Sequence, residues 1–67
     1  MGEKIRELII NNGLKLETVA DNLGITRKTL HSRLSGETDF KVSEITGIIR
    51  LLRLTDEEKQ EIFLLMH

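Results

Sequence analysis

Residues 22–36, NLGITRKTLHSRLSG, carry Arg27, Lys28, His31 and Arg33 and not one acidic side chain. The whole chain of 67 residues has a formal net charge of -1 and a pI near 6.1. Residues 1–36 hold six Lys or Arg against four Asp or Glu, whereas residues 37–67 hold four against seven. The pI argues against a general binder of polyanions but not against a binder with one local basic face.

Length and composition predict one all-α domain that spans residues 1–67. The chain contains no proline and no cysteine, and its apolar residues recur at spacings of three and four without strand-like alternation. We expect five helices, over about residues 3–11, 16–23, 27–34, 42–52 and 56–66. Hydroxyl residues, Thr26 and Thr55, precede two of them as N-caps, and Asn or Gly follows three of them.

A few positions carry specific structural expectations. Phe40 should place its ring in the core, and Gly47 should permit a close approach between two helices. Val42 belongs to the predicted inward face of helix 42–52. In helix 56–66 the buried face should be formed by Ile62 with Leu65 or Met66.

Helices 16–23 and 27–34 are joined by a very short connection around Gly24 and Ile25. Such a turn makes two helices cross steeply, which predicts a helix-turn-helix over about residues 16–34. The small Ala20 would lie where the helices approach most closely, and Leu30 would anchor the second helix to the core. Four matching positions at this spacing are typical of the motif.

The outward face of helix 27–34 consists of hydrogen-bonding side chains and lacks a carboxylate, as a helix in a phosphate-lined major groove requires. Arg and Lys donate to guanine O6 and N7, and Ser or Thr can pair with several base edges. The amide groups at the helix N-terminus add donors for phosphate. The alternative is a solvated face without a partner, which the absence of acids disfavours. His31 either tunes DNA binding with pH or simply faces water, and we favour the second.

The stretch GLKLETVADNLGITRKTLHSRLSGETDF, residues 13–40, resembles the Cro/CI-type (Xre-like) helix-turn-helix of phage and bacterial repressors. The stretch SEITGIIRLLRLTDEEKQEIF, residues 43–63, resembles the last two helices of short members from phages of Gram-positive hosts. The resemblance implies a compact five-helix, lambda-repressor-like domain that binds operator DNA as a dimer. Matching positions imply base contacts from Thr26, Arg27, Lys28 and Ser32, and the outward-facing His31 joins this set. Phosphate contacts are implied for Ser35, Thr38 and Lys41.

Three departures from the family pattern bear on the DNA contacts. The family commonly has a polar cap and a Gln at the start of the second helix, where this chain has Lys15 and Leu16. Lys15 would then serve as the phosphate contact there. Arg33 stands where the family usually has an apolar residue, and we expect it to reach phosphate from the flank of the helix. Glu37 and Asp39 put negative charge near the DNA backbone, which predicts low affinity for each monomer.

The run IFLLM, residues 62–66, is apolar all round its predicted helix. A small core can bury one face of it, so Phe63, Leu64 and Met66 are predicted to form a two-fold dimer interface. The alternative is that the whole run folds into the core. Two histidines without ligand spacing predict no metal site, and we expect no cofactor, small-molecule ligand or enzymatic activity. No segment has the length to span a membrane, so we expect a cytoplasmic protein of a bacterial host cell.

The sequence therefore favours a Cro-like transcriptional repressor that occupies a palindromic operator as a homodimer. Two alternatives keep DNA binding: an antitoxin or accessory regulator whose last helix captures another protein, and a DNA-binding fragment of a CI-like repressor. A third alternative is a protein-interaction module whose basic face meets an acidic partner.

Overall fold

The computed structural model describes Met1–Met66, and His67 lies outside the described residues. These residues form five helices and no strand: α1 (Gly2–Asn11), α2 (Leu16–Leu23), α3 (Arg27–Ser35), α4 (Val42–Leu52) and α5 (Asp56–Leu65). The predicted all-α, five-helix fold is therefore confirmed. The bounds of α2 and α4 coincide with the prediction, and the other three helices differ from it by one residue at an end.

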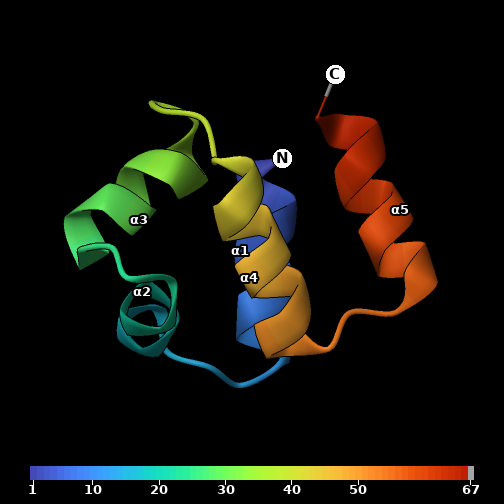
Figure 1. Ribbon diagram of the computed structural model, residues 1–67, viewed down its shortest axis with the longest axis horizontal. Coiled ribbons are helices and arrows are strands. Elements are labelled where there is room, and N and C mark those ends of the chain that lie inside the picture. The colour runs from blue at the N-terminus through green and yellow to red at the C-terminus, as the bar shows by residue number, and fades with distance from the viewer. Residues whose placement is uncertain (67) are drawn as a thin grey trace.

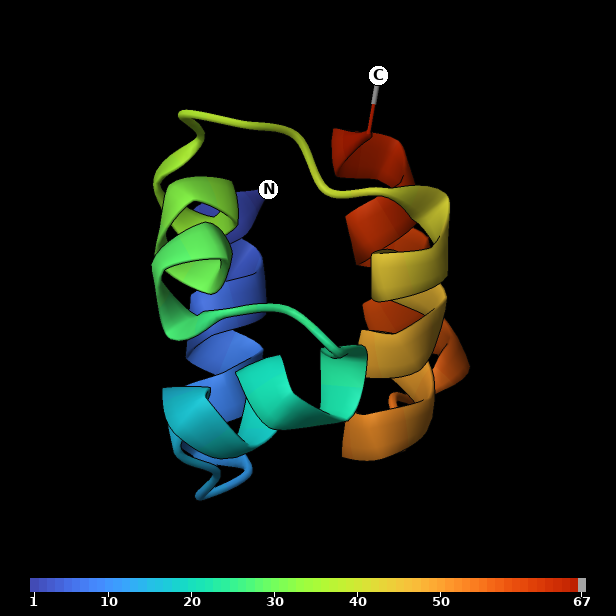
Figure 2. The same cartoon turned by 60° about the vertical axis from the view of Figure 1, so that its left-hand side comes forward.

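The helices pack around one core. In Figure 1, α2 and α3 stand on one side of the molecule, α5 stands on the other, and α1 and α4 lie between them. Figure 2 separates α1 from α4 and shows α2 crossing the end of the bundle. All five helices contribute buried apolar side chains, and Phe40 and Leu54 add to them from the connecting segments. The expectation that Phe40 is buried is thus confirmed.

Two glycines let helices approach closely. A Cβ added at Gly47 would lie 2.7 Å from Cδ2 of Leu23, so the bare backbone of α4 makes room for α2. The expected role of Gly47 is therefore confirmed. A Cβ added at Gly2 would collide with the carbonyl oxygen of Leu34, which brings the start of α1 against the end of α3. This second approach was not predicted.

The inward faces of α4 and α5 are shorter than predicted. The side chain of Val42 is 73% exposed, and Leu65 and Met66 are also exposed, so these three assignments to the core are wrong. Side chains in a helix tilt toward its N-terminus, so Val42 at the first position of α4 projects beyond the core. Leu65 is the last residue of α5 and Met66 is its C-cap, so both lie at the open end of the helix. Ile62, one turn earlier, is fully buried as expected.

An ion pair holds the N-terminal helix against the C-terminal one. Lys4 Nζ on α1 lies 2.7 Å from Glu61 Oε2 on α5. The hydrogen bond to Glu61 raises the pKa of Lys4 above its ordinary value. At its start, α5 has the expected capping box: the Glu58 N–H donates to Thr55 Oγ1, and the Thr55 N–H donates to Glu58 Oε1.

Candidate nucleic-acid interface

A tight turn connects α2 to α3. Gly24 has φ 71° and ψ 27°, a left-handed conformation that residues with a Cβ adopt at a cost. The Ile25 N–H donates to the Ala20 carbonyl over 3.1 Å and closes the end of α2. Ala20 is almost fully buried beneath the turn. Two residues later α3 begins, so the sequence places the two helices as a helix-turn-helix requires.

Thr26 caps the first turn of α3. Its Oγ1 accepts a hydrogen bond from the Thr29 N–H over 3.1 Å and lies 3.0 Å from Thr29 Oγ1. The cap fixes the direction in which α3 leaves the turn. No acidic side chain stands in this first turn, so the positive end of the helix is free to face an anion. The predicted N-cap is confirmed, while a base contact from the same hydroxyl remains a prediction.

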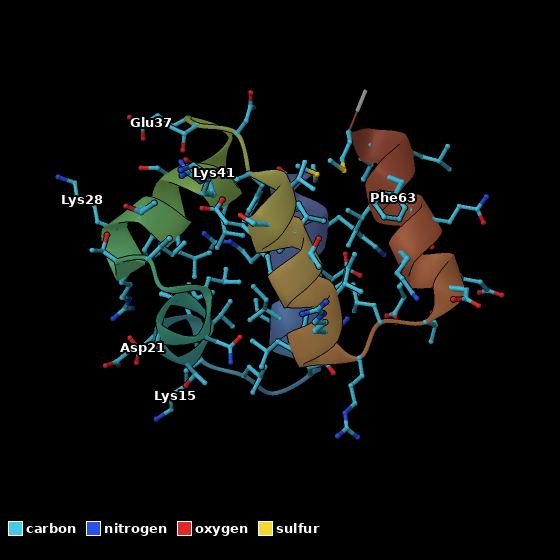
Figure 3. The ribbon with its side chains drawn as sticks, in the orientation of Figure 1. Lys15, Asp21, Lys28, Glu37, Lys41 and Phe63 are labelled. Carbon is cyan, nitrogen blue, oxygen red and sulfur yellow. The ribbon has the colours of Figure 1, made fainter. Side chains whose placement is uncertain are left out.

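The two faces of α3 differ in the expected way. Leu30 and Leu34 are buried in the core, whereas Arg27, Lys28 and His31 are exposed. Figure 3 shows Lys28 extending from α3 away from the body of the molecule. Ser32 is half-buried at the edge of this exposed face. Within residues 1–66, neither Arg27 nor Lys28 takes part in an ion pair, so both are free to donate to another molecule.

Arg33 has a different place from the one predicted. Its Nε donates to Glu44 Oε1 over 2.9 Å and its Nη1 donates to Thr38 Oγ1 over 2.8 Å, and only 14% of the side chain is exposed. A guanidinium already engaged by a buried carboxylate is poorly placed to reach phosphate. We therefore do not include Arg33 among the residues that we propose to contact phosphate.

The remaining predicted phosphate contacts surround α3 in the chain. Lys15 immediately precedes α2 and Lys41 immediately precedes α4, and both are exposed. Ser35 and Thr38 lie at the end of α3 and in the connection to α4, also exposed, and Ser35 Oγ lies 3.2 Å from the Ser32 carbonyl oxygen. In Figure 3, acidic Asp21 and Glu37 stand on either side of Lys28.

A second exposed surface lies at the end of α5. Phe63, Leu64, Leu65 and Met66 are 50, 67, 50 and 38% exposed, and we call these four residues the α5 apolar surface. The ring of Phe63 is visible on the face of α5 in Figure 3. An open cavity of about 550 Å³ adjoins it, lined in part by Leu65, Met66 and Phe40. Leu65, which the sequence placed in the core, thus belongs to this exposed surface as well.

No group of three His, Cys, Asp or Glu side chains within residues 1–66 is arranged to hold a metal ion. None of the described helices has the length and apolarity needed to cross a bilayer.

Comparison with known families agrees with the geometry of α2 and α3. The family model described as a helix-turn-helix domain matches residues 1–62. Searches of curated proteins and of solved structures gave no match. The match covers all of α1–α4 and the first seven residues of α5. Domains of this family bind DNA and are typically not enzymes.

Proposed function

Because this chain belongs to the helix-turn-helix domain family, we propose that it is a Cro-like transcriptional repressor. It would occupy a palindromic operator as a homodimer and block transcription by occupancy. The proposal treats residues 1–67 as one DNA-binding domain in which α3 enters the major groove. Residues of α3 would contact bases, and residues at the starts of α2 and α4 would contact the backbone.

The exposed, acid-free face of α3 carries the proposal. Arg27 and Lys28 occupy the first two positions of the helix, where recognition helices meet base edges. Both are exposed and uncommitted to the protein, and each can donate to guanine O6 and N7. His31 and Ser32 follow on the next turn, and Thr26 precedes the helix. We assign these five residues to base contacts.

Backbone contacts would hold α3 in its groove. Lys15, Ser35, Thr38 and Lys41 are exposed in the segments that flank α2, α3 and α4. Phosphate contacts of this kind fix orientation without conveying sequence information. Each lysine that neutralises a phosphate releases counterions, so it should steepen the salt dependence of binding.

The homodimer would form through the α5 apolar surface. An exposed patch of four large apolar side chains on so small a protein favours an interface. The described residues extend over 28 × 24 × 18 Å, and successive major grooves on one side of DNA are about 34 Å apart. The width of one copy is therefore comparable to the spacing of adjacent half-sites.

Selection of bound sites from a random DNA pool tests the proposal. We expect one short palindrome to be enriched, and the full-length chain to bind it in preference to a scrambled duplex of equal length. Affinity for the scrambled duplex should fall steeply with salt, because only phosphate contacts remain there. Enrichment of no sequence, or equal affinity for both duplexes, would refute sequence-specific binding.

A second candidate function is that of an antitoxin or accessory regulator. In this case α3 still binds DNA, but the α5 apolar surface binds a different protein. The observation in its favour is the small size of that surface, which is confined to the last turns of one ten-residue helix. Native mass measurement separates the two: the purified protein alone should be a dimer under the main proposal and a monomer under this one.

A further inference from the structure

Glu44 is the buried charged residue of the described chain, with 6% of its surface exposed. Its carboxylate receives hydrogen bonds from three donors. Arg33 Nε reaches Oε1 over 2.9 Å, Arg33 Nη2 reaches Oε2 over 3.4 Å, and the Lys41 N–H reaches Oε1 over 2.9 Å. A buried carboxylate is stable only when it is satisfied in this way.

These contacts connect three consecutive segments of the chain: α3, the connecting segment and α4. Arg33 lies near the end of α3, Thr38 lies in the connecting segment 36–41, and Glu44 lies in the first turn of α4. The third arm of the guanidinium, Nη1, donates to Thr38 Oγ1 over 2.8 Å. The Thr38 N–H in turn donates to the carbonyl of Ser32 over 3.2 Å. One planar group thus holds α3, the connection and α4 in a fixed arrangement.

The groups held together are those assigned to different parts of the DNA. Ser32 belongs to the proposed base-contacting face of α3, whereas Thr38 and Lys41 belong to the proposed phosphate contacts. Lys41 is bound to Glu44 through backbone groups: its N–H donates to Glu44 Oε1, and its carbonyl accepts from the Glu44 N–H over 3.0 Å, so its ammonium group takes no part in the contact. A change in the angle between α3 and segment 36–41 would separate these two sets of contacts.

We propose that Arg33 and Glu44 are positioning residues for DNA recognition, whose contact sets segment 36–41 relative to α3 so that base and phosphate contacts form on one duplex at once. This inference rests on the proposed DNA binding. In this role neither the Arg33 nor the Glu44 side chain touches DNA. Arg33 acts through Thr38 and α3, and Glu44 acts through Arg33 and the backbone of Lys41.

The direction in which one substitution changes DNA affinity distinguishes a positioning role from a purely electrostatic effect. Glu44→Gln removes a negative charge near a DNA-facing segment and frees the Arg33 guanidinium. If charge alone mattered, or if Arg33 were a phosphate contact restrained by Glu44, the variant would bind DNA more tightly. Positioning predicts the opposite for a specific site, because the two-point contact with Arg33 is lost.

The experiment compares Glu44→Gln with the matched variant Glu37→Gln. Glu37 is an exposed acid in the same connecting segment and makes no hydrogen bond with another side chain among the described residues. Both variants and the wild type are titrated, by fluorescence anisotropy, against the site selected from the random pool and against its scrambled form. Circular dichroism first establishes that each protein is folded under the conditions of the titration.

We expect Glu44→Gln to bind the selected site roughly tenfold more weakly, with affinity for scrambled DNA unchanged or raised. Glu37→Gln should bind both duplexes a few-fold more tightly, because it removes repulsion without disturbing the arrangement. A role in stability alone would leave folded Glu44→Gln with wild-type affinity for both duplexes. Folded Glu44→Gln that binds the selected site as tightly as the wild type, or more tightly, would overturn the inference.

A second variant covers the case in which Glu44→Gln does not fold. Arg33→Lys retains the positive charge but cannot contact the carboxylate and Thr38 together, because an ammonium lacks the planar fork. Its preference for the selected site should also fall, and wild-type preference in this variant would equally refute positioning. A wild-type chain that selects no site refutes the proposed function itself. A selected site that all variants bind alike refutes only the positioning role.

Discussion

Phe63→Asp should dissociate the proposed homodimer. An aromatic side chain buries about 150–250 Å² when it is covered completely, and half of Phe63 is exposed in the monomer. Covering about 100 Å² at ~25 cal/mol per Å² contributes roughly 2–3 kcal/mol for each copy. A two-fold interface contains the residue twice, so the variant should lose about 4–6 kcal/mol of association free energy. This loss corresponds to a dissociation constant raised by roughly a thousandfold or more.

Sedimentation equilibrium measures that constant directly. Ile10→Asp is the matched control, because Ile10 is 62% exposed and is the penultimate residue of α1. Figure 1 shows this end of α1 remote from the C-terminal end of α5. The control variant should dimerise like the wild type. Operator binding by Phe63→Asp should lose its concentration-dependent cooperativity. A wild type that is monomeric at high concentration, or a Phe63→Asp protein that dimerises normally, would refute the proposed interface.

Three further predictions concern the DNA-facing helix, the buried carboxylate and one backbone conformation. Arg27→Ala and Lys28→Ala should each weaken operator binding by about 1–3 kcal/mol and relax base preference at one position, measured by titration of single-base operator variants; wild-type affinity in both would contradict the assignment of α3. Burial disfavours the charge on Glu44, but hydrogen bonds from Arg33 and the Lys41 N–H outweigh it and hold the pKa of Glu44 below its ordinary value of 4.5. The free energy of unfolding should therefore fall as pH drops from about 4.5 through this lower pKa. Chemical denaturation at a series of pH values should show a smaller decrease in the free energy of unfolding for Glu44→Gln than for the wild type. Arg53 has φ 51° at the end of α4, so Arg53→Gly should raise the free energy of unfolding by about 0.5–1 kcal/mol, and an unchanged denaturation midpoint would count against this strain.

Local chemistry explains why so much of the fold could be predicted from the sequence. The end of α2 and the start of α3 are set by Gly24 and Thr26, whose effects depend only on backbone geometry and on amides within three residues. The periodicity of Leu30 and Leu34 determines which face of α3 is buried. It therefore also determines which face is left for Arg27 and Lys28. These features need no knowledge of the rest of the molecule.

The contacts that were missed join segments that are distant in the chain. Arg33 pairs with a carboxylate eleven residues away, and nothing in the local pattern of α3 distinguishes it from a cation that faces water. One indication was available: Glu44 is four residues before Ile48, which places an acid on the apolar face of α4. Such an acid requires a partner. The exposure of Val42 was likewise hidden, because periodicity defines a face and not how far the core extends along it.

The small number of base-contacting cations on α3 favours a dimer for the proposed function. Each protomer has two cations, Arg27 and Lys28, suited to base contacts, and at about 1–3 kcal/mol each they discriminate by roughly 2–6 kcal/mol. Specific binding typically exceeds non-specific binding by about 4–10 kcal/mol. Two protomers together can supply this range, whereas one protomer reaches only its lower part. Asp21 and Glu37, which stand on either side of Lys28 in Figure 3, should weaken the non-specific attraction of the protein to DNA. A protein held as a monomer should therefore lose discrimination between operator and scrambled DNA, as well as affinity.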